Sequence, residues 1–109
     1  MIYFQNQKAK RIEISTSPFY HPLLPLICDT EIAREASPNL NLPPRFAYPE
    51  DARAQIQKAL DYMSKIFPEP PQGIWPSEAG VSDAVLEILA GEKIKWLATC
   101  EQILEKTIK

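Results

Sequence analysis

The chain has 109 residues, enough for one small domain, and its 45% hydrophobic and 9% aromatic content is ordinary for a globular protein. Its formal net charge of -2 gives no basic field to attract nucleic acid or an anionic membrane surface. The longest apolar stretch, residues 22–28, is interrupted by prolines and is far shorter than the roughly 20 residues that span a bilayer. No signal-peptide pattern follows Met1, so we expect a cytoplasmic protein that binds neither nucleic acid nor membrane.

The cysteines and histidine are too sparse for a metal centre. Cys28 and Cys100 are far apart in the sequence, and His21 is the one histidine. A disulfide framework or a Cys-x-x-Cys clip needs more cysteines at closer spacing. We therefore expect both thiols to be reduced and in or near the core, and we predict neither a metal nor a cofactor.

The first predicted element is a strand. Residues 10–16 read Lys-Arg-Ile-Glu-Ile-Ser-Thr, and this alternation predicts a strand over 11–16. Pro18 ends it. Residues 18–49 then carry seven of the eleven prolines and show no sustained period apart from a short helical turn near 31–36. A loop of this length is more than a connection needs, and it favours a surface with a function.

Helices and short strands alternate after this loop. Apolar residues at every third or fourth position, after a proline and two acids, predict a helix over 50–66. Gly-Ile-Trp predicts a buried strand over 73–76, and Ser82 suits the N-cap of a helix over 83–90. The apolar run at 95–99 predicts a strand whose Trp96 we assign to the core, and the spacing after it predicts a helix over 101–108.

This alternation predicts an α/β fold with parallel strands and right-handed crossovers. Three such strands make a thin sheet with open edges, and a complete α/β barrel takes about 250 residues. We therefore expect a partial (β/α) barrel slice, with about three parallel strands and covering helices.

Glu78 is the first candidate for chemistry, because it follows a strand at its C-terminal end, just before a helix. The alternative from position alone is a solvated helix-capping acid. His21 follows the first predicted strand in the same way, so we expect its side chain on the same rim as Glu78, within about 10 Å. Glu13 alternates with Ile12 and Ile14, and it faces the barrel interior if those isoleucines pack on helices.

Several stretches resemble signature blocks of one family. Residues 12–26, Ile-Glu-Ile-Ser-Thr-Ser-Pro-Phe-Tyr-His-Pro-Leu-Leu-Pro-Leu, and residues 73–78, Gly-Ile-Trp-Pro-Ser-Glu, resemble the second and third blocks of glycoside hydrolase family 57. Residues 32–35 and 49–53 resemble the loop and helix between them. The family comprises retaining α-glucan-acting enzymes of the α-amylase and 4-α-glucanotransferase types, with an incomplete sevenfold barrel. The resemblance implies that residues 1–109 are a fragment of that catalytic domain.

The resemblance, together with the chemistry of the aromatic side chains, gives five candidate site residues. Glu78 corresponds to the catalytic nucleophile, and His21 lies in the turn at the sugar site. Glu13 and Tyr20 are further substrate-binding candidates, and Trp75 is an aromatic residue that could stack on a sugar ring or pack in the core. The implied ligand is an α-glucan or an oligosaccharide.

The resemblance also implies missing parts and departures. The family's first block would lie before Met1, and its aspartate acid/base would lie after Lys109. Cys100 stands where many relatives have Asp, and Lys93 where the helix-to-strand turn usually has Gly, which suggests a turn shifted onto Gly91. Retaining hydrolysis needs two carboxyl groups about 5 to 5.5 Å apart, so we expect the isolated chain to be nearly inactive.

Two alternatives to the enzyme fragment remain open. One is a non-catalytic sugar-binding or interaction module. The other is a piece that assembles with a partner chain, as a homo-oligomer or with the remainder of a barrel, because exposed parallel edges invite pairing. The sequence leaves open whether the chain is itself an enzyme, which linkage it acts on, and whether hydrolysis or transfer dominates.

Overall fold

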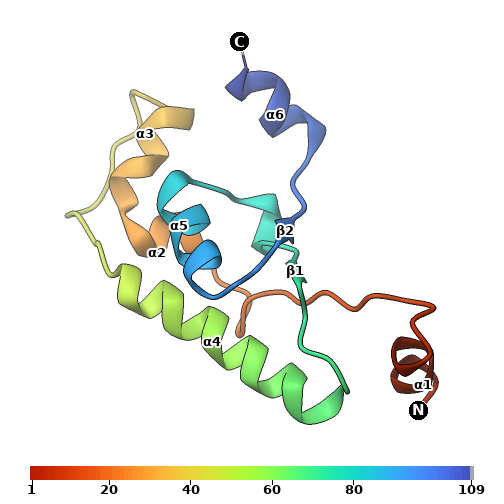
Figure 1. The fold of residues 1–109 in the computed structure, drawn as a ribbon. Helices are drawn as coiled ribbons and strands as arrows, with labels where there is room; N and C mark the ends of the chain where they lie inside the picture. The colour runs from red at the N-terminus through yellow and green to blue at the C-terminus, as the bar shows by residue number, and fades with distance from the viewer. Residues whose placement is uncertain (109) are drawn as a thin grey trace.

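The computed structural model describes residues 1–108, and the chain has an α/β fold with a small parallel sheet (Figure 1). The elements in chain order are α1 (Ile2–Lys8), α2 (Leu24–Cys28), the 3-10 turn η1 (Thr30–Ile32), α3 (Ala33–Ala36), α4 (Pro49–Ile66), β1 (Gly73–Ile74), the 3-10 turn η2 (Ser77–Ala79), α5 (Asp83–Gly91), β2 (Trp96–Leu97) and α6 (Glu101–Thr107).

The sheet is smaller than the sequence predicts. β1 and β2 pair in parallel, with Gly73 opposite Trp96 and Ile74 opposite Leu97. The predicted strand over 11–16 is wrong, because only Thr16 of that segment pairs, in an isolated parallel bridge to Ile74. Two named strands and one bridge therefore replace the three expected strands.

Prolines limit how far the first strand can pair. Thr16 donates its N–H to the carbonyl of Gly73 at 3.3 Å and accepts from the N–H of Trp75 at 2.9 Å. The same register would set residues 12 and 13 opposite Pro70 and Pro71, which have no N–H to donate. Pairing therefore cannot extend toward residue 11.

The predicted helices form close to their expected bounds. α4 begins at Pro49 and ends at Ile66, and α5 is capped by Ser82, whose hydroxyl oxygen accepts from the N–H of Val85 at 3.4 Å. α6 ends at Thr107, one residue before the predicted end. α1 and α2 were not predicted.

The end of α5 departs from the sequence prediction. Lys93 has a φ of 63°, whereas no described glycine, including Gly91, has a positive φ. The N–H of Lys93 donates to the carbonyl of Ala90 at 3.1 Å, and that of Ile94 to Leu89 at 3.0 Å. This is a Schellman ending with lysine in the left-handed position. The suggested shift of the turn onto Gly91 is therefore wrong.

One core holds α2, α4, α5 and β1 together. Figure 1 shows the long α4 running beneath α5, with α2 beside them and the sheet at their edge. The buried residues of this core are Leu24, Cys28, Ala52, Ile56, Ile74, Val85, Ile88 and Leu89. Leu97 packs against the core, so its neighbour Trp96 faces away and is 42% exposed. The assignment of Trp96 to the core is therefore wrong.

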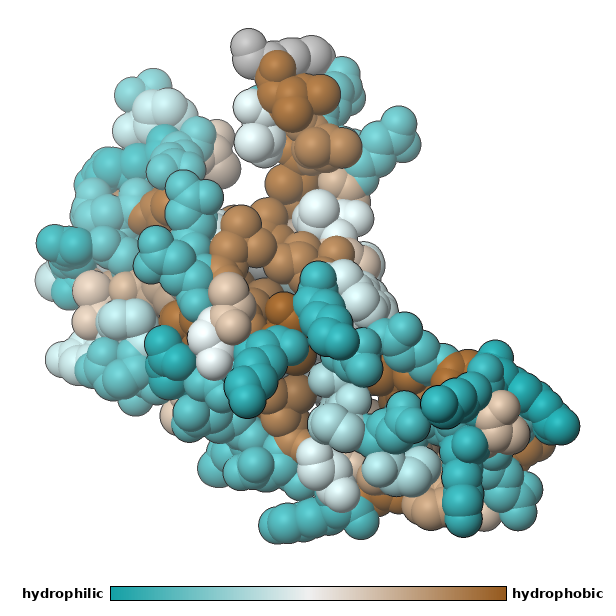
Figure 2. Space-filling view, in the orientation of Figure 1, coloured by the Kyte–Doolittle hydropathy of each residue, from teal (hydrophilic) through white to brown (hydrophobic). Residues whose placement is uncertain are grey.

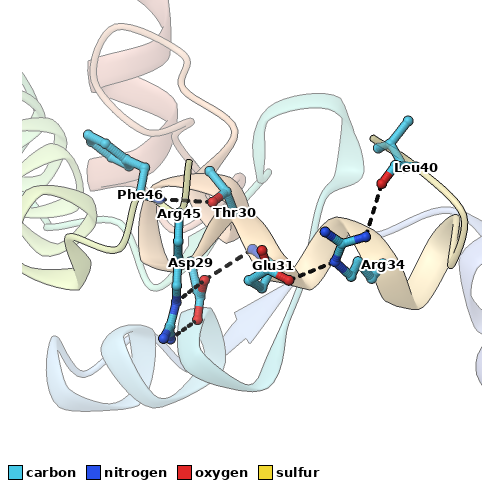
Figure 3. Close-up of polar contacts among 7 residues, drawn as sticks. All are labelled: Asp29, Thr30, Glu31, Arg34, Leu40, Arg45 and Phe46. Carbon is cyan, nitrogen blue, oxygen red and sulfur yellow. Dashed lines mark hydrogen bonds and ion pairs between the residues drawn. The ribbon is translucent and has the colours of Figure 1, made fainter. Parts of the chain in front are cut away.

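Polar contacts order the proline-rich loop before α4 (Figure 3). The guanidinium of Arg45 donates to both carboxylate oxygens of Asp29, at 3.1 and 2.5 Å, and the N–H of Phe46 donates to the hydroxyl of Thr30 at 3.0 Å. The guanidinium of Arg34 donates to the carboxylate of Glu31 at 2.7 Å and to the carbonyl of Leu40 at 3.0 Å. These contacts fasten residues 40–46 to the turn of residues 29–34.

α1 lies away from the core, at the far end of the molecule from α3 and α6 (Figure 1). Its buried Gln7 is fixed through both side-chain atoms to the backbone of Glu69, at 3.2 and 3.4 Å. None of the helices within residues 1–108 has the length and apolar character that crossing a membrane requires.

Candidate functional site

His21 and Glu78 meet at the C-terminal ends of the paired segments. The Nε2 atom of His21 lies 3.4 Å from Oε1 of Glu78, and the two side chains are 54% and 77% exposed. His21 follows the bridge residue Thr16, and Glu78 follows β1, so parallel pairing carries both to one rim. The expected separation below about 10 Å is confirmed.

Two turns of similar form present these side chains. The N–H of His21 donates to the carbonyl of Pro18 at 3.1 Å, and the N–H of Ala79 donates to that of Pro76 at 3.0 Å. The last two residues of each turn have positive φ angles: Tyr20 60°, His21 54°, Glu78 53° and Ala79 57°. The left-handed conformation costs a non-glycine residue roughly 1 to 2 kcal/mol. Such strain gathers at functional sites, where the surrounding structure maintains it.

The turn that carries Glu78 is held firmly from below. Pro76, Ser77 and Ala79 are buried, while Glu78 between them is exposed. The carbonyl of Ala79 accepts from the hydroxyl of Thr99 at 2.9 Å. The buried hydroxyl of Ser77 has no hydrogen-bond partner among residues 1–108. A fixed backbone therefore directs the Glu78 carboxylate outward.

Tyr20 leaves the His21–Glu78 pair and packs toward α4. Its ring contacts Phe19 edge-on, with centroids 4.7 Å apart, and the Nζ of Lys58 lies 5.1 Å from its centroid. The N–H of Phe19 donates to the carbonyl of Gln55 at 3.2 Å, which fixes this turn to the helix. Tyr20 remains 75% exposed. Lys58 was not identified from the sequence, because an exposed helical lysine gives no signal of its own.

Glu13 does not lie at the rim with Glu78. It is exposed, and its Oε1 accepts from the indole Nε1 of Trp96 at 2.7 Å. It precedes the bridge residue Thr16, whereas His21 follows it, so Glu13 lies toward the opposite ends of the paired segments. Trp75 follows β1 directly and is 44% exposed, which leaves its ring open to a ligand.

An apolar groove lies between α2, α3 and α6. It has a volume of about 670 Å³ and is lined by Leu23, Ile32, Val81 and Ile103, among others. Leu23 follows His21 by two residues and Val81 follows Glu78 by three. Figure 2 shows apolar surface continuing from the centre of the molecule up to α6, beside the hollow that separates α6 from α3.

Among residues 1–108, His21 is the side-chain partner of Glu78. Across those residues no cluster of three or more His, Cys, Asp or Glu side chains could hold a metal ion. The site offers an outward carboxylate and an imidazole that can donate to it.

Comparison with known proteins identifies the family. The sequence profile described as glycosyl hydrolase family 57 matches residues 2–107, nearly the whole chain. Searches of curated proteins and of solved structures found no match. The chain belongs to glycosyl hydrolase family 57.

Proposed function

We propose that the chain is part of the catalytic domain of a retaining α-glucan hydrolase or glucanotransferase, with Glu78 as the nucleophile. The observation that carries the proposal is the His21–Glu78 contact on a strained turn, in a chain that the family profile covers from residue 2 to 107. Residues 1–109 then form a slice of a (β/α) barrel, acting in the cytoplasm. The parallel pairing of Thr16, β1 and β2 supports this architecture.

Glu78 attacks the anomeric carbon in this mechanism. The imidazole of His21 donates to one carboxylate oxygen and leaves the other free to form the glycosyl bond. His21 also lies within reach of a sugar hydroxyl. The exposed rings of Tyr20 and Trp75 stack on sugar faces, and the groove along Leu23 and Val81 accommodates the rest of the substrate.

The second carboxyl group comes from outside the chain. Protonation of the leaving oxygen needs an acid about 5 to 5.5 Å from the nucleophile, and acid–base catalysis contributes about a hundred- to ten-thousand-fold. Among residues 1–108 the side-chain partner of Glu78 is the imidazole of His21 and not a second carboxyl group. We therefore expect the chain alone to be nearly inactive on natural glucans.

A fluorinated substrate tests the nucleophile without the acid, because fluoride leaves without protonation. The 109-residue chain is incubated with 5-fluoro-α-glucosyl fluoride, and peptide mass spectrometry locates the label. Wild type and the control Glu87→Gln, a change on the exposed face of α5, should carry the sugar on Glu78. The variant Glu78→Gln should remain unlabelled. A label on another residue, or no label on the wild type, contradicts the assignment.

Non-catalytic sugar binding is the second candidate. It is favoured by the exposed Tyr20 and Trp75, because stacking on a sugar face needs no acid or base. Saturable binding of maltotriose together with no labelling of Glu78 would favour this function. The open edges of the sheet favour, in turn, assembly with a partner chain or a second copy.

A further inference from the structure

Trp96 lies flat across β1, on the face of the sheet that turns away from the core. A Cβ added to Gly73 would meet three ring atoms of Trp96 at 1.9, 2.2 and 2.3 Å, so only glycine leaves room for the ring. The indole N–H donates to Glu13 at 2.7 Å. Glycine beneath and a carboxylate at the edge therefore hold an exposed ring in one place.

A polar cavity is lined by Glu13, the residue that accepts from this ring. Its volume is about 280 Å³, and its lining includes Gln7, Lys10, Arg11, Glu13, Glu69 and Gln72. Two of these residues also contact Trp96, since Glu13 accepts from the indole and the carbonyl of Gln72 accepts from the Trp96 N–H at 3.4 Å. Glu13 therefore contacts the ring and lines the cavity, and Gln72 links the Trp96 backbone to the same lining.

The lining selects the class of ligand. Lys10 and Arg11 balance Glu13 and Glu69, so an anion would meet two carboxylates and a cation would meet two positive charges. An apolar ligand would remove water from charged groups without replacing their hydrogen bonds. A neutral, hydroxyl-rich ligand satisfies both donors and acceptors, and its apolar face can stack on the indole.

We propose that Trp96, Glu13 and this cavity form a second saccharide-binding site that takes a neutral hexose unit and has no catalytic role. The site lies at the amino-terminal ends of the paired segments, where Gln72 precedes β1, whereas His21 and Glu78 lie at the carboxyl-terminal ends. It does not require Glu78 to be a nucleophile. It anchors a glucan at a distance from the rim.

Nuclear magnetic resonance of the 109-residue chain, titrated with maltotriose, tests the proposal. The Trp96 indole signal and the Glu13 and Gln72 amide signals should shift together and saturate. Trp96→Ala should weaken binding, as read from the two amides, about five- to tenfold, the range expected for losing an aromatic stacking contact. The matched control Trp75→Ala should leave the affinity read from the Glu13 and Gln72 amides unchanged. Trp96→Phe keeps an aromatic ring but loses the hydrogen bond to Glu13. It should therefore weaken maltotriose binding less than Trp96→Ala does.

Other outcomes separate this site from the rim. Maltotriose shifts that vanish in Trp75→Ala and persist in Trp96→Ala would place binding at the rim alone and overturn the second site. Inorganic phosphate is titrated in parallel, and shifts at Glu13 and Gln72 with phosphate but not with maltotriose would overturn the neutral ligand. If Glu78 is not labelled while maltotriose still shifts the Trp96 signal, the proposed catalysis is contradicted and the second saccharide site is supported.

Discussion

The imidazole of His21 and the carboxylate of Glu78 are in contact at 3.4 Å although 57 positions separate them in the sequence. Each side chain follows a segment that pairs in parallel with the other, so the contact results from the pairing of Thr16 with Ile74. The proline-initiated turns then orient the two residues. The same short stretch of sheet therefore sets both the core and the geometry of the proposed site.

The His21–Glu78 contact should affect the rate of Glu78 labelling. We expect His21→Ala to slow the reaction with 5-fluoro-α-glucosyl fluoride by no more than about fivefold, because a contact between two exposed side chains contributes at most about 1 kcal/mol. His21→Asn retains an N–H donor on a shorter side chain and should slow it less. Initial labelling rates followed by intact mass provide the measurement. Equal rates for wild type and His21→Ala would mean that the contact does not position the carboxylate.

Replacing Lys93, the left-handed residue at the end of α5, should stabilise the protein. Lys93→Gly removes the steric cost of a φ of 63° and should raise the free energy of unfolding by about 1 kcal/mol. Urea unfolding followed by circular dichroism measures the change. Lys95→Gly is the control, because Lys95 is equally exposed and has no positive φ. A loss of stability in Lys93→Gly would contradict this account.

The sequence predicted helices with a strong apolar period better than elements that depend on a partner elsewhere in the chain. The apolar period of α4 is strong, so its bounds were predicted within one residue. α2 was missed because Leu24–Cys28 is short, almost wholly apolar and contains Pro25, and so shows no amphipathic period. The expected strand over 11–16 is cut short because two of its partner positions hold prolines, a property of another segment.

Part of the site was predictable because it depends only on parallel pairing. Parallel pairing sufficed to bring His21 and Glu78 together even though one bridge replaced the first strand. The partner of Glu13 could not be predicted, because the Trp96 ring reaches it only by crossing Gly73. Such a contact depends on the absence of a side chain between two strands, which no periodic pattern reveals.

The Asp29–Arg45 contact should make the free energy of unfolding depend on pH. The hydrogen bond from Arg45 is the largest cause that lowers the pKa of Asp29 below its ordinary value of 3.8. A lowered folded-state pKa contributes stability that is present above the ordinary value and is lost as the pH falls through the lowered one. We expect Asp29→Asn to lower the urea midpoint at pH 7 and to have little effect below the lowered pKa. The control Asp61→Asn, on exposed α4 surface, should show no such difference between the two pH values, and a similar loss for Asp29→Asn at both would contradict the linkage.

Ser77 tests whether the turn beneath Glu78 depends on packing or on polar contacts. Its side chain is 1% exposed, and its hydroxyl finds no partner among residues 1–108, so Ser77→Ala should leave the free energy of unfolding unchanged or raise it. Ile74, at 0% exposure, is the matched core position, and Ile74→Ala should cost about 2 to 5 kcal/mol through lost burial and a cavity. Urea unfolding of both variants, with Glu78 labelling as the second measurement, checks this. If Ser77→Ala costs more than about 1 kcal/mol, the hydroxyl makes a stabilising hydrogen bond in solution. If Ser77→Ala keeps its stability but loses labelling, the hydroxyl acts on the Glu78 turn directly, and packing alone does not set the direction of the carboxylate.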